Sequence, residues 1–139
     1  MSLFVLDTDT LTLWLRGHAR VSERIAAHAP SELCTTIVTI EEILRGWYTQ
    51  IRRAKSDEQI ARAYGSLQQT LHIAALLRVL AFDRAAIQRF NKLRTQKLRV
   101  GTNDLKIAAT VLENQAFLVT RNQSDFRQIP DLALEDWSQ

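Results

Sequence analysis

The chain has 139 residues, of which 46% are hydrophobic and 24% charged, with a net charge of +3; this balance suits one globular domain (residues 1–139) and excludes extended disorder. Four glycines and two prolines are few for this length and favour a helix-rich chain over an all-β fold. The single cysteine excludes an internal disulfide or a cysteine zinc cluster, and no apolar run approaches the roughly 18 residues of a membrane span. Because the first six residues also lack the basic start of a secretory signal, we expect a cytoplasmic protein.

The N-terminal third predicts two strand-like runs that each lead toward a helix. Phe4-Val-Leu is a short apolar run, and Asp7-Thr-Asp-Thr after it supplies a helix start. The β-branched run Cys34–Thr39 predicts either another strand or a helix entered through an extended approach. The apolar positions that follow it recur at helical spacing: Ile40, Ile43, Leu44 and Trp47. Within that segment Gly46 is expected to be a point of close packing.

The middle of the chain predicts two further helices separated by a short strand. Ser56-Asp-Glu starts a long amphipathic helix that runs to about Leu77. Its apolar stripe repeats every three or four residues: Ile60, Tyr64, Leu67, Leu71 and Ala74. Val79-Leu-Ala-Phe then predicts a strand, and Asp83 caps a helix to about Lys97 with a buried stripe of Ile87, Phe90 and Leu93.

The last third repeats the alternation of helix and strand. Gly101–Asp104 predicts a loop and cap, with Thr102 or Asn103 as the capping residue and Asp104 in the first helical turn. Phe117–Thr120 predicts a strand, Arg121–Asp125 a polar turn, and Ala133-Leu-Glu an edge strand. The alternation indicates an α/β fold with a mainly parallel central sheet and right-handed crossovers.

Three carboxylates follow predicted strands or begin a helix at comparable positions: Asp7, Asp104 and Asp125. Connections at the carboxyl ends of parallel strands share one edge of the sheet, so these side chains can converge there, with Glu41 or Glu42 as a fourth. Four like charges repel, so convergence implies a divalent cation, and an all-oxygen site suits Mg²⁺ or Mn²⁺ better than zinc. Any one of these acids, taken alone, is better explained as a helix cap or a turn residue, so the interpretation as a site rests on the joint pattern.

Two weaker features accompany the acids. Thr120 and Asn122 can position a water or a phosphate, or can simply satisfy the backbone of the turn. Between Arg84 and Arg99 there are six basic residues and no acid, which predicts either an RNA-binding strip or a solvated helix face. The candidate contacts to an RNA backbone are Arg45, Lys92, Arg94, Lys97 and Arg99, with Arg52 and Arg53 nearby.

Nearly the whole chain resembles the PIN-domain ribonucleases, and within them the VapC-type toxins of toxin–antitoxin pairs. Four segments carry the resemblance, in the family's order and at its separations: Leu6-Asp7-Thr8, Thr39-Ile-Glu-Glu42-Ile-Leu-Arg-Gly46, Gly101-Thr-Asn-Asp104-Leu-Lys-Ile-Ala-Ala109 and Leu118-Val-Thr-Arg-Asn122-Gln-Ser-Asp125. The family pattern favours Glu42 over Glu41, although Gly46 stands one position later than the pattern places it.

The resemblance implies a PIN-like three-layer α/β/α fold and a Mg²⁺- or Mn²⁺-dependent endoribonuclease that cleaves RNA phosphodiester bonds by metal-activated water. The acidic quartet would be Asp7, Glu42, Asp104 and Asp125, with Asp7 and Asp104 as first metal ligands and Thr120 and Asn122 in support. It also implies a homodimer and a small antitoxin that covers the acidic groove and itself binds operator DNA.

Two rival hypotheses remain. One is a catalytically silent PIN-like module that binds nucleic acid or protein, although four clustered carboxylates do not suit a pure binder of an anionic ligand. The other is a phosphatase of the HAD type, because Asp7-Thr-Asp9 follows an apolar strand. Leu11 stands where that family expects a small or β-branched residue, which makes it the weaker alternative.

Overall fold

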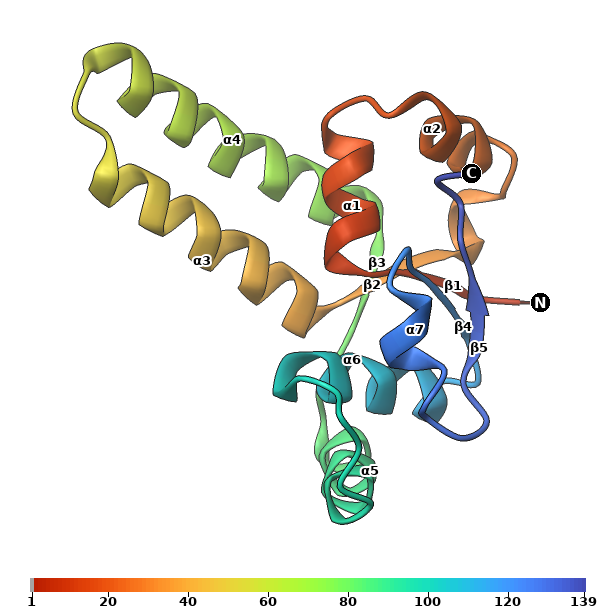
Figure 1. The fold of residues 1–139 in the computed structure, drawn as a ribbon. Coiled ribbons are helices and arrows are strands. Elements are labelled where there is room, and N and C mark those ends of the chain that lie inside the picture. Colours follow the sequence, from red (N-terminus) through yellow and green to blue (C-terminus); the bar gives the residue numbers. More distant parts are fainter. Residues whose placement is uncertain (1) are drawn as a thin grey trace.

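The computed structural model describes residues 2–139, in which a five-stranded parallel sheet forms the centre of the molecule (Figure 1). The strands run in the spatial order β3 (Arg78–Leu80), β2 (Leu33–Thr36), β1 (Phe4–Leu6), β4 (Phe117–Val119) and β5 (Ala133–Glu135). Every neighbouring pair is parallel, so the carboxyl ends of all five strands lie along one edge. The predicted α/β class with a mainly parallel sheet is confirmed.

Helices cover both faces of this sheet. The elements before β3 are α1 (Thr8–Leu15), α2 (Ala19–Ala26), the 3-10 turn η1 (Pro30–Glu32), α3 (Ile37–Arg53) and α4 (Asp57–Leu76). After it come α5 (Arg84–Thr95), α6 (Thr102–Glu113) and the short α7 (Gln123–Phe126). No helix within residues 2–139 is long and apolar enough to cross a membrane.

Side chains of alternate residues in the central strands pack into two separate hydrophobic cores, one on each face of the sheet. Val5, Cys34 and Leu118 pack with residues of α5, α6 and α7 on one face. Leu6 and Val119 point to the other face, where they pack with Trp137 and with residues of α1, α2 and α3. This alternation is the two-residue period of a strand, and it produces the expected three layers.

Helices α3 and α4 form an antiparallel pair that projects from the body of the molecule in Figure 1, and we call residues 37–76 the arm. The β-branched run before it divides at Thr36: β2 ends there, and the Thr36 side chain accepts a hydrogen bond from the Thr39 backbone N–H. Residues 37–39 therefore belong to the helix, because the threonine cap stops the strand that propensity alone would extend.

The long helix runs almost as predicted, from its Ser56 cap to Leu76, but it packs through a different face. Ala63 and Thr70 are its buried residues, whereas Ile60, Tyr64 and Leu71 of the predicted stripe are 40–54% exposed. Periodicity detects an apolar face without showing what covers it, and here α3 takes the face with the smaller side chains. In α5, likewise, Phe90 and Leu93 are buried while Ile87 is exposed.

Other differences are local. Helix α2 was not predicted, since its N-cap is His18, whose ring Nδ1 accepts from the Val21 N–H. The predicted turn after β4 contains α7. The N-cap of α6 is Gly101, so Thr102 and Asn103 lie inside the helix and leave their side chains free for other partners.

Candidate functional site

Asp7 stands at the carboxyl end of β1, where it caps α1. Its Oδ1 accepts the Thr10 backbone N–H at 2.8 Å, and the residue is only 6% exposed. Burial raises the pKa of Asp7 above its ordinary value, and hydrogen bonds from Thr120 and Thr10 oppose that rise. Asp7 is thus both the N-cap of α1 and a candidate site residue, so the helix-cap explanation does not exclude a functional one.

Glu42 is held on two sides by residues from other helices. The Thr8 hydroxyl of α1 donates to its Oε1 at 2.5 Å, and the Asn103 amide of α6 donates to its Oε2 at 3.3 Å. We call these two hydrogen bonds the Glu42 clamp. Glu41, about 100° away around α3, instead pairs with Arg45 at 2.7 Å on the exposed side of the arm. The structure therefore brings Glu42, and not Glu41, toward the other acids.

Asp104 lies in the first turn of α6 and is half-buried. Burial raises its pKa, and the negative charges of Glu42, Asp7 and Asp125 raise it further, to about 6. Three carboxylates from three other elements are thus close enough to act on this one. The predicted convergence of the four acids is what the structure contains, while their chemical role remains a prediction.

Asp125 is tied to Asp7 through the two supporting residues. The Asn122 side-chain amide donates to the Asp125 carboxylate at 3.1 Å, and the Asn122 backbone N–H donates to the Thr120 hydroxyl at 2.9 Å. The fully buried Thr120 hydroxyl in turn bonds to Asp7. Thr120 and Asn122 therefore satisfy the backbone of the turn and hold Asp7 and Asp125 in place, while a role in positioning a water or a phosphate stays a prediction.

The donor set fits a divalent cation. Within residues 2–139 none of the four carboxylates forms an ion pair with a lysine, arginine or histidine, so their mutual repulsion is uncompensated by protein. Carboxylate oxygens are the ligands that Mg²⁺ and Mn²⁺ prefer. In the described chain no three acidic, histidine or cysteine side chains are yet close enough to hold a metal ion. Binding would therefore draw these carboxylates together against their repulsion.

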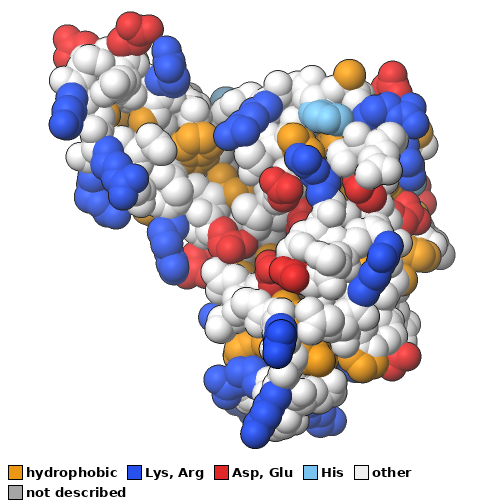
Figure 2. Space-filling model, viewed as in Figure 1, with side chains coloured by type: hydrophobic (Ala, Val, Ile, Leu, Met, Phe, Trp, Pro, Cys, Tyr) orange, Lys and Arg blue, Asp and Glu red, His pale blue; other side chains and the backbone are white. Residues whose placement is uncertain are grey.

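Glu42 borders a hollow that runs along the arm. Acidic side chains gather in the middle of the face shown in Figure 2, with basic ones on the arm and at the α5 end on either side. A hollow of about 320 Å³ there is lined by Glu42, Arg45, Gly46, Thr49 and Asn103. The expectation that Gly46 packs closely is wrong, because a Cβ added there would meet no atom within 4 Å.

The candidate RNA-binding residues fall in two places. Arg45 lines the hollow, while Lys92, Arg94, Lys97 and Arg99 are exposed on α5 and the segment after it. The Arg94 guanidinium lies 4.9 Å from the centre of the Phe90 ring and also donates to Asn91. Sequence reasoning missed Thr8, whose only signal is that it follows Asp7 at a helix start.

Comparison with known proteins assigns the chain to a family. The model of the PIN domain matches residues 4–132. The chain belongs to the PIN-domain family. The family resemblance found in the sequence is thereby confirmed, and the alternative of a HAD-type phosphatase is set aside.

Among PIN-domain proteins the chain is similar to VapC ribonucleases over its full length. It is 25% identical to Ribonuclease VapC1 of Haemophilus influenzae strain R2866 over 138 residues, 98% of each chain. It is also 25% identical to the tRNA(fMet)-specific endonuclease VapC of Salmonella typhimurium strain LT2, with 99% of both chains covered. The structure of DNA-bound VapBC from Salmonella typhimurium aligns over 99% of both chains with a TM-score of 0.80 and 25% identity.

The Glu42 clamp generates the first testable prediction. Replacing Asn103 by Ala removes one of the two hydrogen bonds to Glu42, and we expect the Mn²⁺ affinity, measured by calorimetry, to fall about 10-fold. The melting temperature should not fall, since Ala is the better helix former inside α6. Thr102→Ala, in the same turn but exposed, is the matched control and should bind Mn²⁺ as the parent does.

The same substitution in a Glu42→Ala background separates positioning from a general effect. If Asn103 acts through Glu42, Asn103→Ala costs nothing further there. Equal losses of Mn²⁺ affinity in both backgrounds would contradict the clamp.

Proposed function

We propose that this PIN-domain chain is a divalent-metal-dependent endoribonuclease, working as one domain, that hydrolyses RNA phosphodiester bonds as the toxin of a toxin–antitoxin pair. The observation that carries the proposal is the convergence of four carboxylates, from the N-cap of α1 and from α3, α6 and α7, none of which forms an ion pair with a lysine, arginine or histidine of residues 2–139. Full-length similarity to proteins named as VapC ribonucleases supports RNA as the substrate. A cytoplasmic location is part of the same proposal.

Each acid has a proposed role that follows from its position. Asp7 and Asp104 are the first choice for direct ligands, since they are the two whose pKa is raised by burial among like charges. Glu42 and Asp125 hold the ion directly or through its water, because hydrogen bonds from Thr8, Asn103 and Asn122 already fix their carboxylates. Bound Mg²⁺ or Mn²⁺ supplies Lewis acidity for the scissile phosphate and for the attacking water.

The first test of this function uses a mixture of total tRNA and rRNA with the purified chain, freed of any co-purifying antitoxin. We expect discrete fragments that require Mg²⁺ or Mn²⁺. In Asp104→Asn, prepared identically to control for contaminating ribonuclease, cleavage should fall by more than the 10- to 100-fold typical of losing an outer partner of a metal site. Unchanged cleavage in that variant would refute the site.

Absence of cleavage by either protein, with RNA binding retained, would instead support the catalytically silent binding module.

RNA binding is proposed to use the two basic regions that flank the acids in Figure 2. Cations on both sides of an acidic centre can hold the backbone while the metal site takes the scissile phosphate. The residues concerned are Arg45, Lys92, Arg94, Lys97 and Arg99.

Charge reversal on α5 tests that region. Each phosphate contact to a single strand contributes about 0.7 to the slope of log affinity against log salt. We therefore expect Lys92→Glu with Arg94→Glu to weaken RNA binding in an Asp104→Asn background and to flatten that slope by about one unit or more. Arg16→Glu with Arg20→Glu changes the net charge equally on other helices and is the control. An unchanged slope in the α5 variant would exclude this strip.

The proposed partners are a second copy of the chain, which the family resemblance implies, and a small antitoxin, which the VapBC structures among similar structures support. Light scattering after gel filtration should give twice the chain mass for the free protein. The complex purified from its natural source should contain two chains together with a bound small protein. A mass of one chain at every concentration tested would contradict the homodimer.

A further inference from the structure

A line of residues on α3 leads from the acidic site toward the tip of the arm. Glu42, Gly46, Thr49 and Arg53 are spaced by four, three and four residues, so they share one face of the helix. At 1.5 Å per residue, Glu42 and Arg53 are about 16 Å apart along the axis. We call these four residues the α3 stripe.

The first part of the stripe lies in the 320 Å³ hollow beside the acidic site. Asn103 of α6 also lines it, and the Arg45 guanidinium, another lining group, pairs with the exposed Glu41. Gly46 has no side chain to fill the hollow, and nothing lies within 4 Å of the position a Cβ would take. Glycine is a poor residue for a helix interior, and packing does not require it at this position. The physical consequence of having glycine at position 46 is open space in the hollow on this side of α3.

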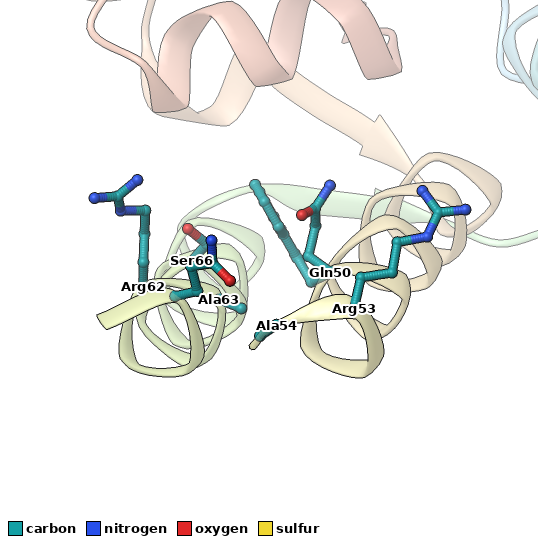
Figure 3. Close-up of a pocket in the computed structure, with 8 residues that line it drawn as sticks. Gln50, Arg53, Ala54, Arg62, Ala63 and Ser66 are labelled. Atoms are coloured by element: carbon teal, nitrogen blue, oxygen red, sulfur yellow. The ribbon is translucent and has the colours of Figure 1, made fainter. Parts of the chain in front are cut away.

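The far end of the stripe opens into a second cavity at the arm tip, of about 410 Å³. Figure 3 shows Arg53 of α3 and Arg62 of α4 standing on opposite sides of this cavity, with Gln50 between them. Trp47 also lines it, and its indole N–H donates to the Thr70 hydroxyl at 2.8 Å, which fixes the ring.

This combination of groups suits a nucleotide. A fixed aromatic ring offers a stacking surface for a base, amide side chains can bond to base edges, and arginines on both sides can contact phosphates. The volume lies within the usual range for small-ligand pockets. Arg53 has no ion-pair partner in residues 2–139, and Arg62 has only the exposed Glu58.

We propose that a single-stranded flank of the RNA lies along the α3 stripe. The arm-tip cavity then binds a base of that flank about five stacked nucleotides from the scissile bond. This number is the 16 Å length of the stripe divided by about 3.4 Å per nucleotide. The inference rests on the proposed ribonuclease function and adds where the substrate lies and what selects it. The arm is then a specificity element rather than a passive projection.

Filling the hollow tests the path without risk to the fold. We expect Gly46→Leu to raise the KM for a cleaved single-stranded RNA about 10-fold, while Mn²⁺ affinity is unchanged and the melting temperature is unchanged or higher. Gly65→Leu is the matched control, since Gly65 is also inside a helix with nothing within 4 Å of its added Cβ, but lies outside both cavities. An unchanged KM in Gly46→Leu would overturn the path.

Shortening the RNA tests the cavity. Arg53→Ala with Arg62→Ala should raise the KM for the full RNA about 10-fold and leave it unchanged for an RNA trimmed to two nucleotides on the side that follows the arm. Arg16→Ala with Arg20→Ala, which removes two exposed arginines far along the chain from the cavity lining, is the control. Equal effects on both RNA lengths, or none on either, would refute the arm-tip site.

Binding separates this inference from the proposed function. If the parent protein cleaves no RNA, the proposed function fails, and the path is then tested alone by the anisotropy of a fluorescein-labelled 12-nucleotide RNA in an Asp104→Asn background. Weaker binding in the Gly46→Leu and arginine variants supports the path. Unchanged RNA binding, even with weaker binding of a protein partner, would reject it.

Discussion

The repulsion between four carboxylates at one edge of the sheet is the constraint on which the rest of the site depends. A parallel sheet directs the ends of β1 and β4 to the same edge, and helices α3, α6 and α7 bring the remaining acids there. Burial makes the charges costly, as the pKa of about 6 at Asp104 shows. Hydrogen bonds hold three of the acids, Asp7, Glu42 and Asp125, in place against this cost, and a bound cation would offset the repulsion among all four.

Those hydrogen bonds also connect the site to the arm. Glu42 is the acid that α3 contributes, and Thr8 and Asn103 fix it from two other helices. Arg53, at the far end of the α3 stripe, also lines the arm-tip cavity, so Glu42 and the proposed RNA path share one helix. A shift of the arm would therefore change metal binding and substrate contact together.

The sequence predicted most of the features that depend on the two-residue period of strands and the 3.6-residue period of helices. The parallel strands, the caps at Asp7, Ser56 and Asp83 and the candidates Asp7, Asp104 and Asp125 follow from local signals. The choice of Glu42 over Glu41 came from the family resemblance. The burial of α4 could not be predicted, because its stripe of Ile60, Tyr64 and Leu71 has the right period but faces away from α3. The hydrogen bonds of Thr8 and Asn103 to Glu42 could not be predicted from local signals either, since Glu42 lies 34 and 61 residues away from them. The prediction of close packing at Gly46 was wrong because the space around a helical glycine depends on the neighbouring elements, which the local sequence does not specify.

The most direct test of the central claim is a crystal of the chain grown with Mn²⁺ and measured for anomalous scattering near the manganese edge. We expect a peak within ligand distance, about 2.0–2.3 Å, of carboxylate oxygens from Asp7 and Asp104. The carboxylates of Glu42 and Asp125 should contact the same ion or its bound waters. A fully occupied Mn²⁺ site elsewhere, with no peak between Asp7 and Asp104, would contradict the claim that these acids gather to bind a metal.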